Sequence, residues 1–375
     1  MAMRLSKSVV GKKEADAVSD IIINCGYLGM GEYVGLFEKE IEAYIGNPAY
    51  RAVCVNSGTA ALHLAIAAVT KPGDEVLVPT FTFVATYQAI LAAHCVPVSC
   101  DIDPDTLLID LKDAEKRITS KTKVVLPVFY ASNTCNRAEV YAFAKKHTLR
   151  VVEDAAHAFG CVQDGSKIGA DGDMICFSFD GIKNITSGEG GCIMTSDPEA
   201  LQYVQDARLL GVMKDSEKRY AGLRSWDFDV VNQGYRYHMS NIFAGIGREQ
   251  LKRLEPEFAP KRKALAYRYY ENLKDVKGVK LIKGIDFKNT ISFIYPVMIE
   301  DDKRDMIKDK LNEAGVPTGV HYKPNHLLSL FKTDYELPAA MKVYEEIITL
   351  PLHPELSVEE VDMICGVIKQ AIGRG

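Results

Sequence analysis

The 375-residue sequence lacks the features of several protein classes. It has no long basic block, and its net charge of −5 gives no electrostatic reason to expect binding to DNA, RNA or an anionic membrane. No apolar segment is long enough to span a bilayer, and the opening MAMRLSKSVVGKKEAD lacks the continuous apolar stretch of a signal peptide. We therefore expect a cytoplasmic protein that binds a small molecule, with no nucleic acid or membrane partner.

The nine cysteines do not form a recognisable framework. No CxxC motif and no Cys/His cluster at zinc spacing is present, so the sequence predicts no metal site. Cys54, Cys176 and Cys192 lie inside apolar, strand-like runs, which indicates reduced and buried side chains. The sequence also lacks a low-complexity linker and a fixed-period repeat, so we expect its domains to pack closely.

With 47% apolar and 25% charged residues, the chain can bury a substantial core. From about residue 50 to 195, short β-branched runs alternate with helical patterns. This alternation predicts βαβ units that build a mostly parallel sheet with helices on both faces, and so an α/β fold with its chemistry at the carboxyl ends of the strands. The predicted strands are AVCV, DEVLVP, TKVVLPVF, LRVVED, DMICFSF and GCIMTS.

The pattern changes near residue 255. Helices that we expect to break around Pro256 and Pro260 are followed by separate strands and helices, such as TISFIYPVMI and DKRDMIKDKLNEAG. The sequence therefore predicts a large α/β domain over residues 1–254, which includes the N-terminal segment, and a smaller α+β domain over residues 255–375.

Two of the predicted strands end in polar groups. Ser57, Gly58 and Thr59 stand where a strand meets a helix, and unpaired N–H groups at a helix N-terminus suit a phosphate. An ordinary helix N-cap explains the same residues. Asp154 ends another strand, where an acid can hold a pyridinium nitrogen protonated, although it too could be an N-cap.

A third strand, DMICFSF, leads into a short loop that contains Lys183. Between two buried strands, desolvation and a nearby cation can lower the pKa of a lysine and prepare it for Schiff-base chemistry. A solvated surface charge is the common alternative for a loop lysine. For Glu189 and the glycines around it we expect a structural role.

These segments, in order, resemble a known family. NSGTAALHLA, EDAAHA and SF-x-x-x-KNITSGEGG are similar to the DegT/DnrJ/EryC1/StrS family of sugar aminotransferases, which have fold type I of the pyridoxal-phosphate enzymes. The likeness covers nearly the whole chain. It continues through GYLGMGEYVGLFEKEIEAYIG, PTFTFVATYQAI, GYRYHMSNIFAGIGREQL, GVHYKP and LPLHPELSVEEVDMI.

The resemblance implies pyridoxal 5'-phosphate as the cofactor and gives the matching residues roles. Lys183 would bond the cofactor and move the proton between it and the substrate carbon, and Asp154 would pair with the pyridine nitrogen. His157 matches a position near the ring hydroxyl. Phe83 matches the aromatic residue that stacks on the ring, although the sequence alone favours core packing for it. The residues implied to hold the phosphate are Ser57, Gly58, Thr59 and Ser178.

The resemblance also implies a homodimer with shared active sites. Family members commonly have GYNYRM in the segment that reaches the partner's cofactor phosphate, whereas this chain has Arg236 and His238 in place of the usual Asn and Arg. An arginine or a histidine can still bind a phosphate. On the substrate side the matching residues are His321, Tyr322 and His326, for which surface positions are the alternative.

The activity implied is transfer of an amino group from L-glutamate to a nucleotide-linked keto-sugar, such as a dTDP-4-keto-6-deoxyhexose, in deoxysugar, O-antigen or lipopolysaccharide biosynthesis. Lys183 argues against the family's sugar dehydratases, which have a histidine there. A desulfurase is disfavoured because no cysteine falls in an evident catalytic loop. A sugar 3-aminotransferase, a cyclitol aminotransferase and a non-catalytic binding protein of the same fold stay open.

Overall fold

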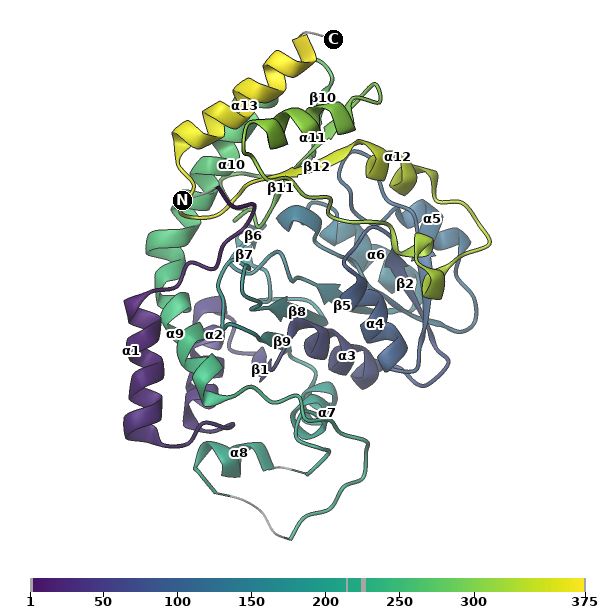
Figure 1. The fold of residues 1–375 in the computed structure, drawn as a ribbon. Coiled ribbons are helices and arrows are strands. Elements are labelled where there is room, and N and C mark those ends of the chain that lie inside the picture. The colour runs from purple at the N-terminus through teal and green to yellow at the C-terminus, as the bar shows by residue number, and fades with distance from the viewer. Residues whose placement is uncertain (1–2, 214, 224–226, 374–375) are drawn as a thin grey trace.

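The computed structural model describes residues 3–213, 215–223 and 227–373, which form a large α/β domain below a smaller α+β domain in the view of Figure 1. The large domain contains a seven-stranded sheet of order β1-β9-β8-β5-β4-β2-β3. Only β9 runs antiparallel to its neighbours, which confirms a mostly parallel sheet. The strands are β1 (Arg51–Val55), β2 (Glu75–Pro79), β3 (Val96–Cys100), β4 (Thr122–Val125), β5 (Arg150–Asp154), β8 (Met174–Ser178) and β9 (Gly191–Thr195).

One strand of this sheet was not expected. β3 lies at the sheet edge beside β2, and its first three side chains are exposed or half-buried. An edge strand does not need a continuous apolar run and tolerates a proline such as Pro97. Its sequence VPVSC therefore carries a weak strand signal.

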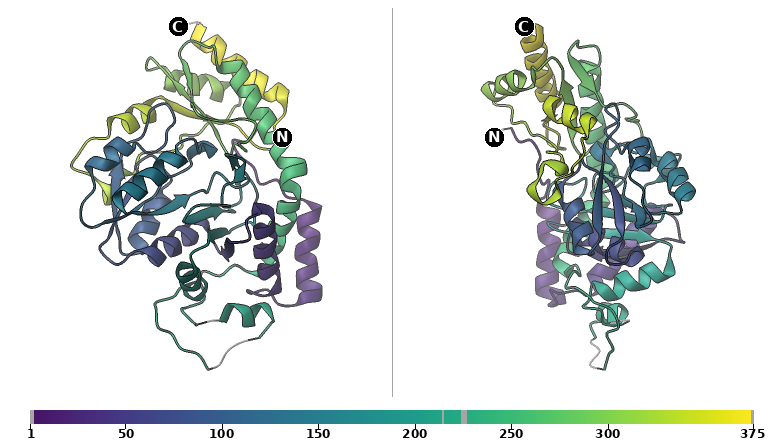
Figure 2. Two further views of the ribbon diagram at one scale, coloured as in Figure 1. Left: turned by 180° about the vertical axis from the view of Figure 1, so that it is seen from behind. Right: turned by 90° about the vertical axis from the view of Figure 1, so that its right-hand side faces the viewer.

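Helices cover both faces of the sheet, as the two further views show (Figure 2). Side chains alternate along β1, so Val53 and Val55 pack in the cluster of α3 and α4, whereas Cys54 packs with α2. Cys54, Cys176 and Cys192 are buried and reduced, as expected. The helices on the first face are α3 (Gly58–Val69), α4 (Val84–Ala92) and α7 (Pro198–Ala207), and those on the second are α2 (Glu32–Ile45), α5 (Leu111–Lys116) and α6 (Arg137–His147).

A continuous helical run connects the two domains along one side of the molecule (Figure 1). It consists of α9 (Asn241–Arg253), η3 (Leu254–Phe258) and α10 (Ala259–Leu273). The break expected at Pro256 and Pro260 is wrong. η3 is a π-helix in which the Ala259 N–H donates to the Leu254 carbonyl, and this wider turn accommodates Pro256. Pro260 lies in the first turn of α10, where no N–H is needed.

The smaller domain is built on an antiparallel sheet of order β10-β11-β12. Its apolar core is formed mainly by that sheet with α10, α11 and α13, and the N-terminal segment reaches it through a hydrogen bond from Leu352 N–H to the Leu5 carbonyl. The division expected at residue 254 falls inside the helical run and stays a prediction. The elements are β10 (Val279–Leu281), β11 (Tyr295–Ile299), β12 (Ile347–Leu350), α11 (Arg304–Glu313), α12 (Pro338–Glu346) and α13 (Val358–Gly373).

Short elements complete the chain. α1 (Lys12–Asp20) packs against α9, and no helix among the described residues has the length and apolarity needed to cross a bilayer. The remaining elements are η1 (Ile21–Cys25), η2 (Tyr130–Ser132), η4 (Asn325–Leu327), η5 (Ser329–Phe331), β6 (Val162–Gln163), β7 (Ser166–Lys167) and α8 (Asp215–Tyr220).

The end of β5 places two carboxylates on opposite faces of the sheet. Glu153 is completely buried toward α6, where its Oε1 accepts hydrogen bonds from Arg137 Nε at 2.9 Å and Tyr141 Oη at 2.6 Å. Burial raises the pKa of Glu153 to about 7 against the opposing effect of Arg137. Asp154, the next residue, faces α4. Because side chains alternate along β5, Glu153 faces α6, where it supports the fold, and Asp154 faces the opposite side of the sheet.

We predict that Glu153→Gln removes a pH dependence of stability. Because the pKa of Glu153 is higher in the folded chain, the folded state binds more protons between pH 4.5 and 7, and its stability falls as the pH rises through that range. From pH 5 to 7 the free energy of unfolding should fall by about 2 kcal/mol more in the wild type than in Glu153→Gln. Urea unfolding at both pH values measures this, with Glu139→Gln as control, since Glu139 is exposed on α6, the helix that carries Arg137. Equal slopes in wild type and Glu153→Gln would contradict it.

Candidate active site

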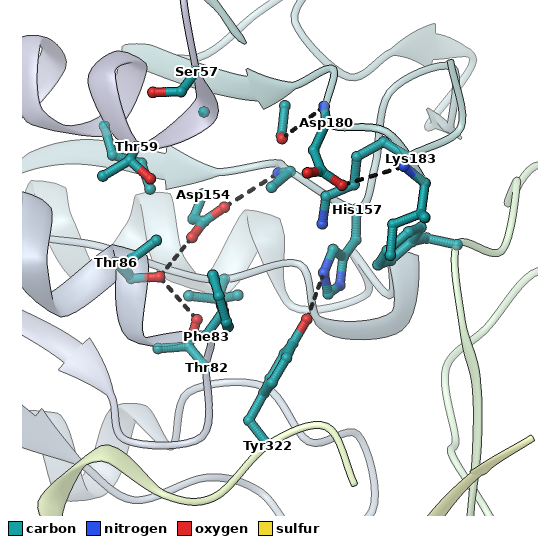
Figure 3. A pocket seen from close by; sticks show the side chains of 18 of the residues that line it. Ser57, Thr59, Thr82, Phe83, Thr86, Asp154, His157, Asp180, Lys183 and Tyr322 are labelled. Atoms are coloured by element: carbon teal, nitrogen blue, oxygen red, sulfur yellow. Dashed lines mark hydrogen bonds between the residues drawn. The ribbon is translucent and has the colours of Figure 1, made fainter. Parts of the chain in front are cut away.

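A pocket of about 370 Å³ opens at the carboxyl ends of the parallel strands (Figure 3). Chain segments at or after the ends of five different strands line it, and two segments near β11 and β12 of the smaller domain close its far side. This is where the sheet topology predicts the chemistry. The lining residues used below are Ser57, Gly58, Thr59, Phe83, Thr86, Asp154, His157, Ser178, Asp180, Lys183, Phe293, His321 and Tyr322.

The Ser57 turn is a helix cap that also faces the pocket. Ser57 has an extended backbone, and its Oγ accepts a hydrogen bond from Ala60 N–H at 3.1 Å to begin α3. A Cβ on Gly58 would lie 2.8 Å from the Cβ of Ser178, so only glycine lets the two turns approach this closely. The N-cap interpretation is therefore correct, and it leaves the N-terminus of α3 pointing into the pocket.

Asp154 is buried beside α4. Its Oδ2 accepts from Thr86 Oγ1 at 2.8 Å and its Oδ1 from Ala156 N–H at 3.2 Å (Figure 3). Burial raises the pKa of this carboxyl, while both hydrogen bonds and Lys183 act in the opposite direction. A turn, not a helix, follows it, so it is not a helix N-cap. No lysine or arginine in the described part of the chain forms a salt bridge with Asp154.

Lys183 occupies the loop between β8 and β9, where it is half-buried. Its Nζ lies 4.0 Å from the centroid of the Phe293 ring. Burial lowers the pKa of Lys183 to about 8, against the opposing charges of Asp154 and Asp180. The surface alternative is therefore wrong. The nearby cation that we expected does not contribute, because burial accounts for the lowered pKa.

Two histidines in the pocket are neutral near pH 7. Burial lowers the pKa of His157 well below its usual value and that of His321 to about 4, with Lys183 adding to both effects. His157 Nε2 lies 3.3 Å from the Tyr322 hydroxyl, and His321 Nδ1 lies 2.9 Å from Thr349 Oγ1. The pocket thus offers uncharged hydrogen-bonding groups beside its one amine.

Phe83 is not a core residue. Its side chain is 55% exposed at the pocket, and its ring lies 5.5 Å from that of Tyr322. Core packing, which the sequence alone favoured, is wrong because the chain turns outward after β2 and Phe83 precedes the first residue of α4. An exposed aromatic ring at a pocket provides a flat apolar contact for a planar ligand.

Three expected residues lie outside the pocket of their own chain. Arg236 is exposed and His238 half-buried, next to the end of β1. His326 lines a separate surface hollow, and its Nδ1 lies 2.8 Å from Thr80 Oγ1. Conversely, Thr86 and Phe293 were not singled out from the sequence. Thr86 follows a predicted strand and could have been found by that rule, whereas nothing local marks Phe293.

Comparison with known proteins gives the pocket its context. The family model for DegT/DnrJ/EryC1/StrS aminotransferases matches residues 9–369. The chain belongs to this family. It is 33% identical to spore coat polysaccharide biosynthesis protein SpsC of Bacillus subtilis over 98% of the chain and 96% of the relative. It is 31% identical to a dTDP-4-dehydro-2,3,6-trideoxy-D-glucose 4-aminotransferase of Saccharopolyspora spinosa, over 99% and 97% respectively.

A solved structure is similar over the whole chain. The sugar aminotransferase Spr1654 of Streptococcus pneumoniae in its PLP-form has a TM-score of 0.89 at 30% identity, covering 100% of this chain and 99% of that one. The resemblance inferred from the motifs is thereby confirmed. The protein is an enzyme, an aminotransferase of fold type I that uses pyridoxal phosphate.

The pocket residues fit this cofactor. Asp154 is a buried carboxylate without a salt bridge in the described chain, which suits a protonated ring nitrogen. Gly58 and Ser178 lie close together in the lining, at the N-terminus of α3. The unpaired backbone N–H groups at a helix N-terminus suit a phosphate. Lys183 has the lowered pKa that a nucleophilic amine needs.

Proposed function

We propose that the enzyme moves an amino group from L-glutamate to the ketone of a nucleotide-linked sugar, a dTDP-4-keto-6-deoxyhexose, and so forms an amino-deoxy sugar nucleotide. The relative from Saccharopolyspora spinosa, named as a 4-aminotransferase of a dTDP-linked keto-sugar, supports this substrate class. The relative SpsC, named for spore coat polysaccharide biosynthesis, supports a place in the formation of a cell-surface polysaccharide. A cytoplasmic location is consistent with such a substrate.

The observation that carries the proposal is the composition of the pocket. Lys183 and Asp154 face the same cavity, and no arginine is among the described residues that line it. A small oxo acid acceptor binds best to a guanidinium that holds its carboxylate with two hydrogen bonds. The donor L-glutamate carries the same carboxylate, so its recognition requires a cationic group from outside this described lining. The neutral side chains of His157, His321 and Tyr322 suit the hydroxyl groups of a sugar instead.

An extended acceptor would reach beyond this pocket. A cavity of about 370 Å³ is at the lower end of the range for small-molecule sites, which is about 300–1,000 Å³. It suits the cofactor and the reacting sugar, so the nucleotide and its diphosphate would lie beyond the pocket mouth. We propose that His321 and Tyr322 contact the sugar. His326, in the separate hollow, is outside the reach of that part of the substrate.

When bound, pyridoxal phosphate supplies an electron sink that stabilises negative charge on the substrate carbon bearing the nitrogen. We propose that Lys183 holds it by a covalent bond from Nζ, with Asp154 at the ring nitrogen. Phe83 would stack on the ring, and His157 would lie near the ring hydroxyl. Ser57, Gly58, Thr59 and Ser178 would hold the phosphate.

The proton transfers fall to Lys183. With a pKa of about 8, its amine exists in both protonation states near neutral pH, so it can remove a proton from the donor carbon and return one to the acceptor carbon. Burial raises the pKa of Asp154, whereas the hydrogen bonds from Thr86 and Ala156 favour its ionised form, and a cationic ring nitrogen beside it would favour that form further. Asp154 is buried and Lys183 half-buried, which limits the access of water to these transfers.

We also propose a homodimer in which Arg236 and His238 complete the partner's cofactor site. The Asn56 N–H donates to the Tyr237 carbonyl at 2.7 Å, so this segment is held beside the Ser57 turn but outside its own pocket. Phe228 and Val231, in the loop that leads to it, are exposed apolar side chains that an interface would cover. Two-fold symmetry would then make both sites equivalent.

Lys183→Ala is expected to abolish covalent attachment of the cofactor and to reduce turnover by at least about 10²- to 10⁴-fold, because one amine performs both tasks. Borohydride reduction of the loaded enzyme followed by peptide mass analysis locates the bond, and steady-state assays measure turnover. The exposed Lys123→Ala serves as control. Attachment at another lysine, or near-normal turnover in Lys183→Ala, would disprove the assignment.

Subunit mixing tests the shared site. Lys183→Ala and the double variant Arg236→Ala/His238→Ala should each be inactive as pure dimers, because each lacks one half of every site. After joint refolding, mixed dimers contain one intact site, so activity should return to about a quarter of the wild-type value. Absence of recovery, or full activity of a monomer in sedimentation, would contradict the cross-subunit roles.

The substrate is tested by competition between acceptors. With L-glutamate as donor, kcat/KM for a dTDP-4-keto-6-deoxyhexose should exceed that for pyruvate or oxaloacetate by about 10²-fold or more, since buried polar groups left unpaired penalise the wrong substrate. UDP- and GDP-linked keto-sugars complete the panel. NMR of the product distinguishes amination at the 4-position from the 3-position. Better turnover of the oxo acids would overturn the sugar assignment while leaving the Lys183 chemistry intact.

A further inference from the structure

Phe293 lies between two nitrogen-bearing side chains of the pocket. It precedes β11, and it is only 3% exposed. The Lys183 Nζ is 4.0 Å from the centroid of its ring, and the His157 ring centroid is 4.4 Å from it at an interplanar angle of 40°. The smaller-domain segment thus supplies an apolar surface directly against the amine.

The backbone of Phe293 is held on both sides. Its N–H donates to Ser132 Oγ at 3.0 Å, and Ser132 Oγ in turn donates to the His157 carbonyl. The Phe293 carbonyl accepts from Arg262 Nη1 at 3.2 Å, and Arg262 is itself only 2% exposed. Because these partners are buried, the ring has a fixed position relative to the pocket.

We propose that Phe293 is a positioning residue whose ring holds the ammonium group of Lys183 inside the pocket whenever that amine is not bonded to the cofactor. The inference rests on the proposed role of Lys183. The lysine side chain is flexible, and its amine must stay near the substrate carbon during proton transfer. An ammonium group within about 6 Å of a ring centroid is attracted by the negative face of the ring, and more strongly where water is excluded.

The contact between the Phe293 ring and the Lys183 amine affects the protonation of that amine. The ring favours the charged amine, so it opposes the effect of burial on the pKa of Lys183. His157 and His321 are neutral near pH 7, and burial raises the pKa of the Tyr322 hydroxyl far above that range. The other ionisable groups around Lys183 are Asp154, Asp180 and Glu189 in the pocket and Lys7 and Arg262 behind the loop.

The test measures the pKa of Lys183 in the full-length protein freed of cofactor. Acetic anhydride labels the free amine, and peptide mass analysis gives the labelling rate at Lys183 from pH 6 to 10. In Phe293→Leu the site stays dry but loses the ring, so the midpoint should fall by about 0.5 to 1 pH unit. Because the wild-type pKa is about 8, labelling at pH 7 should then be about 3- to 5-fold faster.

Matched variants distinguish the loss of the ring beside Lys183 from a general disturbance of the fold. Phe293→Tyr keeps a ring and should keep the wild-type midpoint, whereas Phe293→Met removes the ring and should repeat the shift if Phe293→Leu does not fold. Phe143→Leu removes a buried ring that packs 4.7 Å from His147, away from the pocket, and should leave the midpoint unchanged. In the loaded enzyme, the pH profile of the half-reaction with the keto-sugar should shift in the same direction.

An unchanged or raised midpoint in both Phe293→Leu and Phe293→Met would overturn the proposal, as would an equal shift in Phe143→Leu. The experiments distinguish a failure of the proposed function from a failure of the proposed role of Phe293. If borohydride reduction places the cofactor on another lysine, the proposed function is wrong, yet the labelling of Lys183 still reports whether the ring controls its protonation.

Discussion

The buried carboxylate of Asp154 is the electrostatic constraint on which the site depends. An ionised carboxylate inside a protein is costly unless hydrogen bonds or an opposite charge compensate it. Thr86 and the Ala156 N–H provide two hydrogen bonds, and no salt bridge from the described residues uses the remaining attraction. That attraction is available to a cationic ring nitrogen. The same burial raises the pKa of Asp154 and lowers that of Lys183 to about 8, so it acts against the charged form of both groups.

Sheet geometry keeps this chemistry apart from the support of the fold. Glu153 and Asp154 are neighbours in sequence, yet the alternation of side chains along β5 sends the first to Arg137 and Tyr141 and the second to Thr86. Glu153 has its partners within the protein, whereas Asp154 keeps capacity for a ligand. Exchanging the two environments would require a one-residue slip of β5, which would move every side chain of the strand to the opposite face.

The sequence predicted the parts of the site that follow directly from strand order. Asp154 and Lys183 each follow a buried strand, and parallel strands bring such ends together, so their proximity could be inferred without coordinates. Phe83 could not be placed, because the direction of the chain after β2 decides whether its ring enters the core or the pocket. Phe293 and Tyr322 come from the smaller domain, where tertiary packing brings them to the site; Tyr322 was named through the family resemblance, whereas Phe293 was not named at all. The helical run through Pro256 depends on a π-helix that no local pattern indicates.

The two sides of the pocket follow different physical requirements. On the side of the sheet, short turns such as Ser57 to Thr59 approach Ser178 so closely that a Cβ on Gly58 cannot be accommodated, which fixes the cofactor end. On the other side, Phe293, His321 and Tyr322 lie on segments near β11 and β12 of the smaller domain, which are not part of the seven-stranded sheet. A family can therefore keep one cofactor chemistry while the acceptor changes. The fold is retained at a TM-score of 0.89 with 30% identity, which is consistent with a sheet side that fixes the fold and a separate wall formed by the smaller domain.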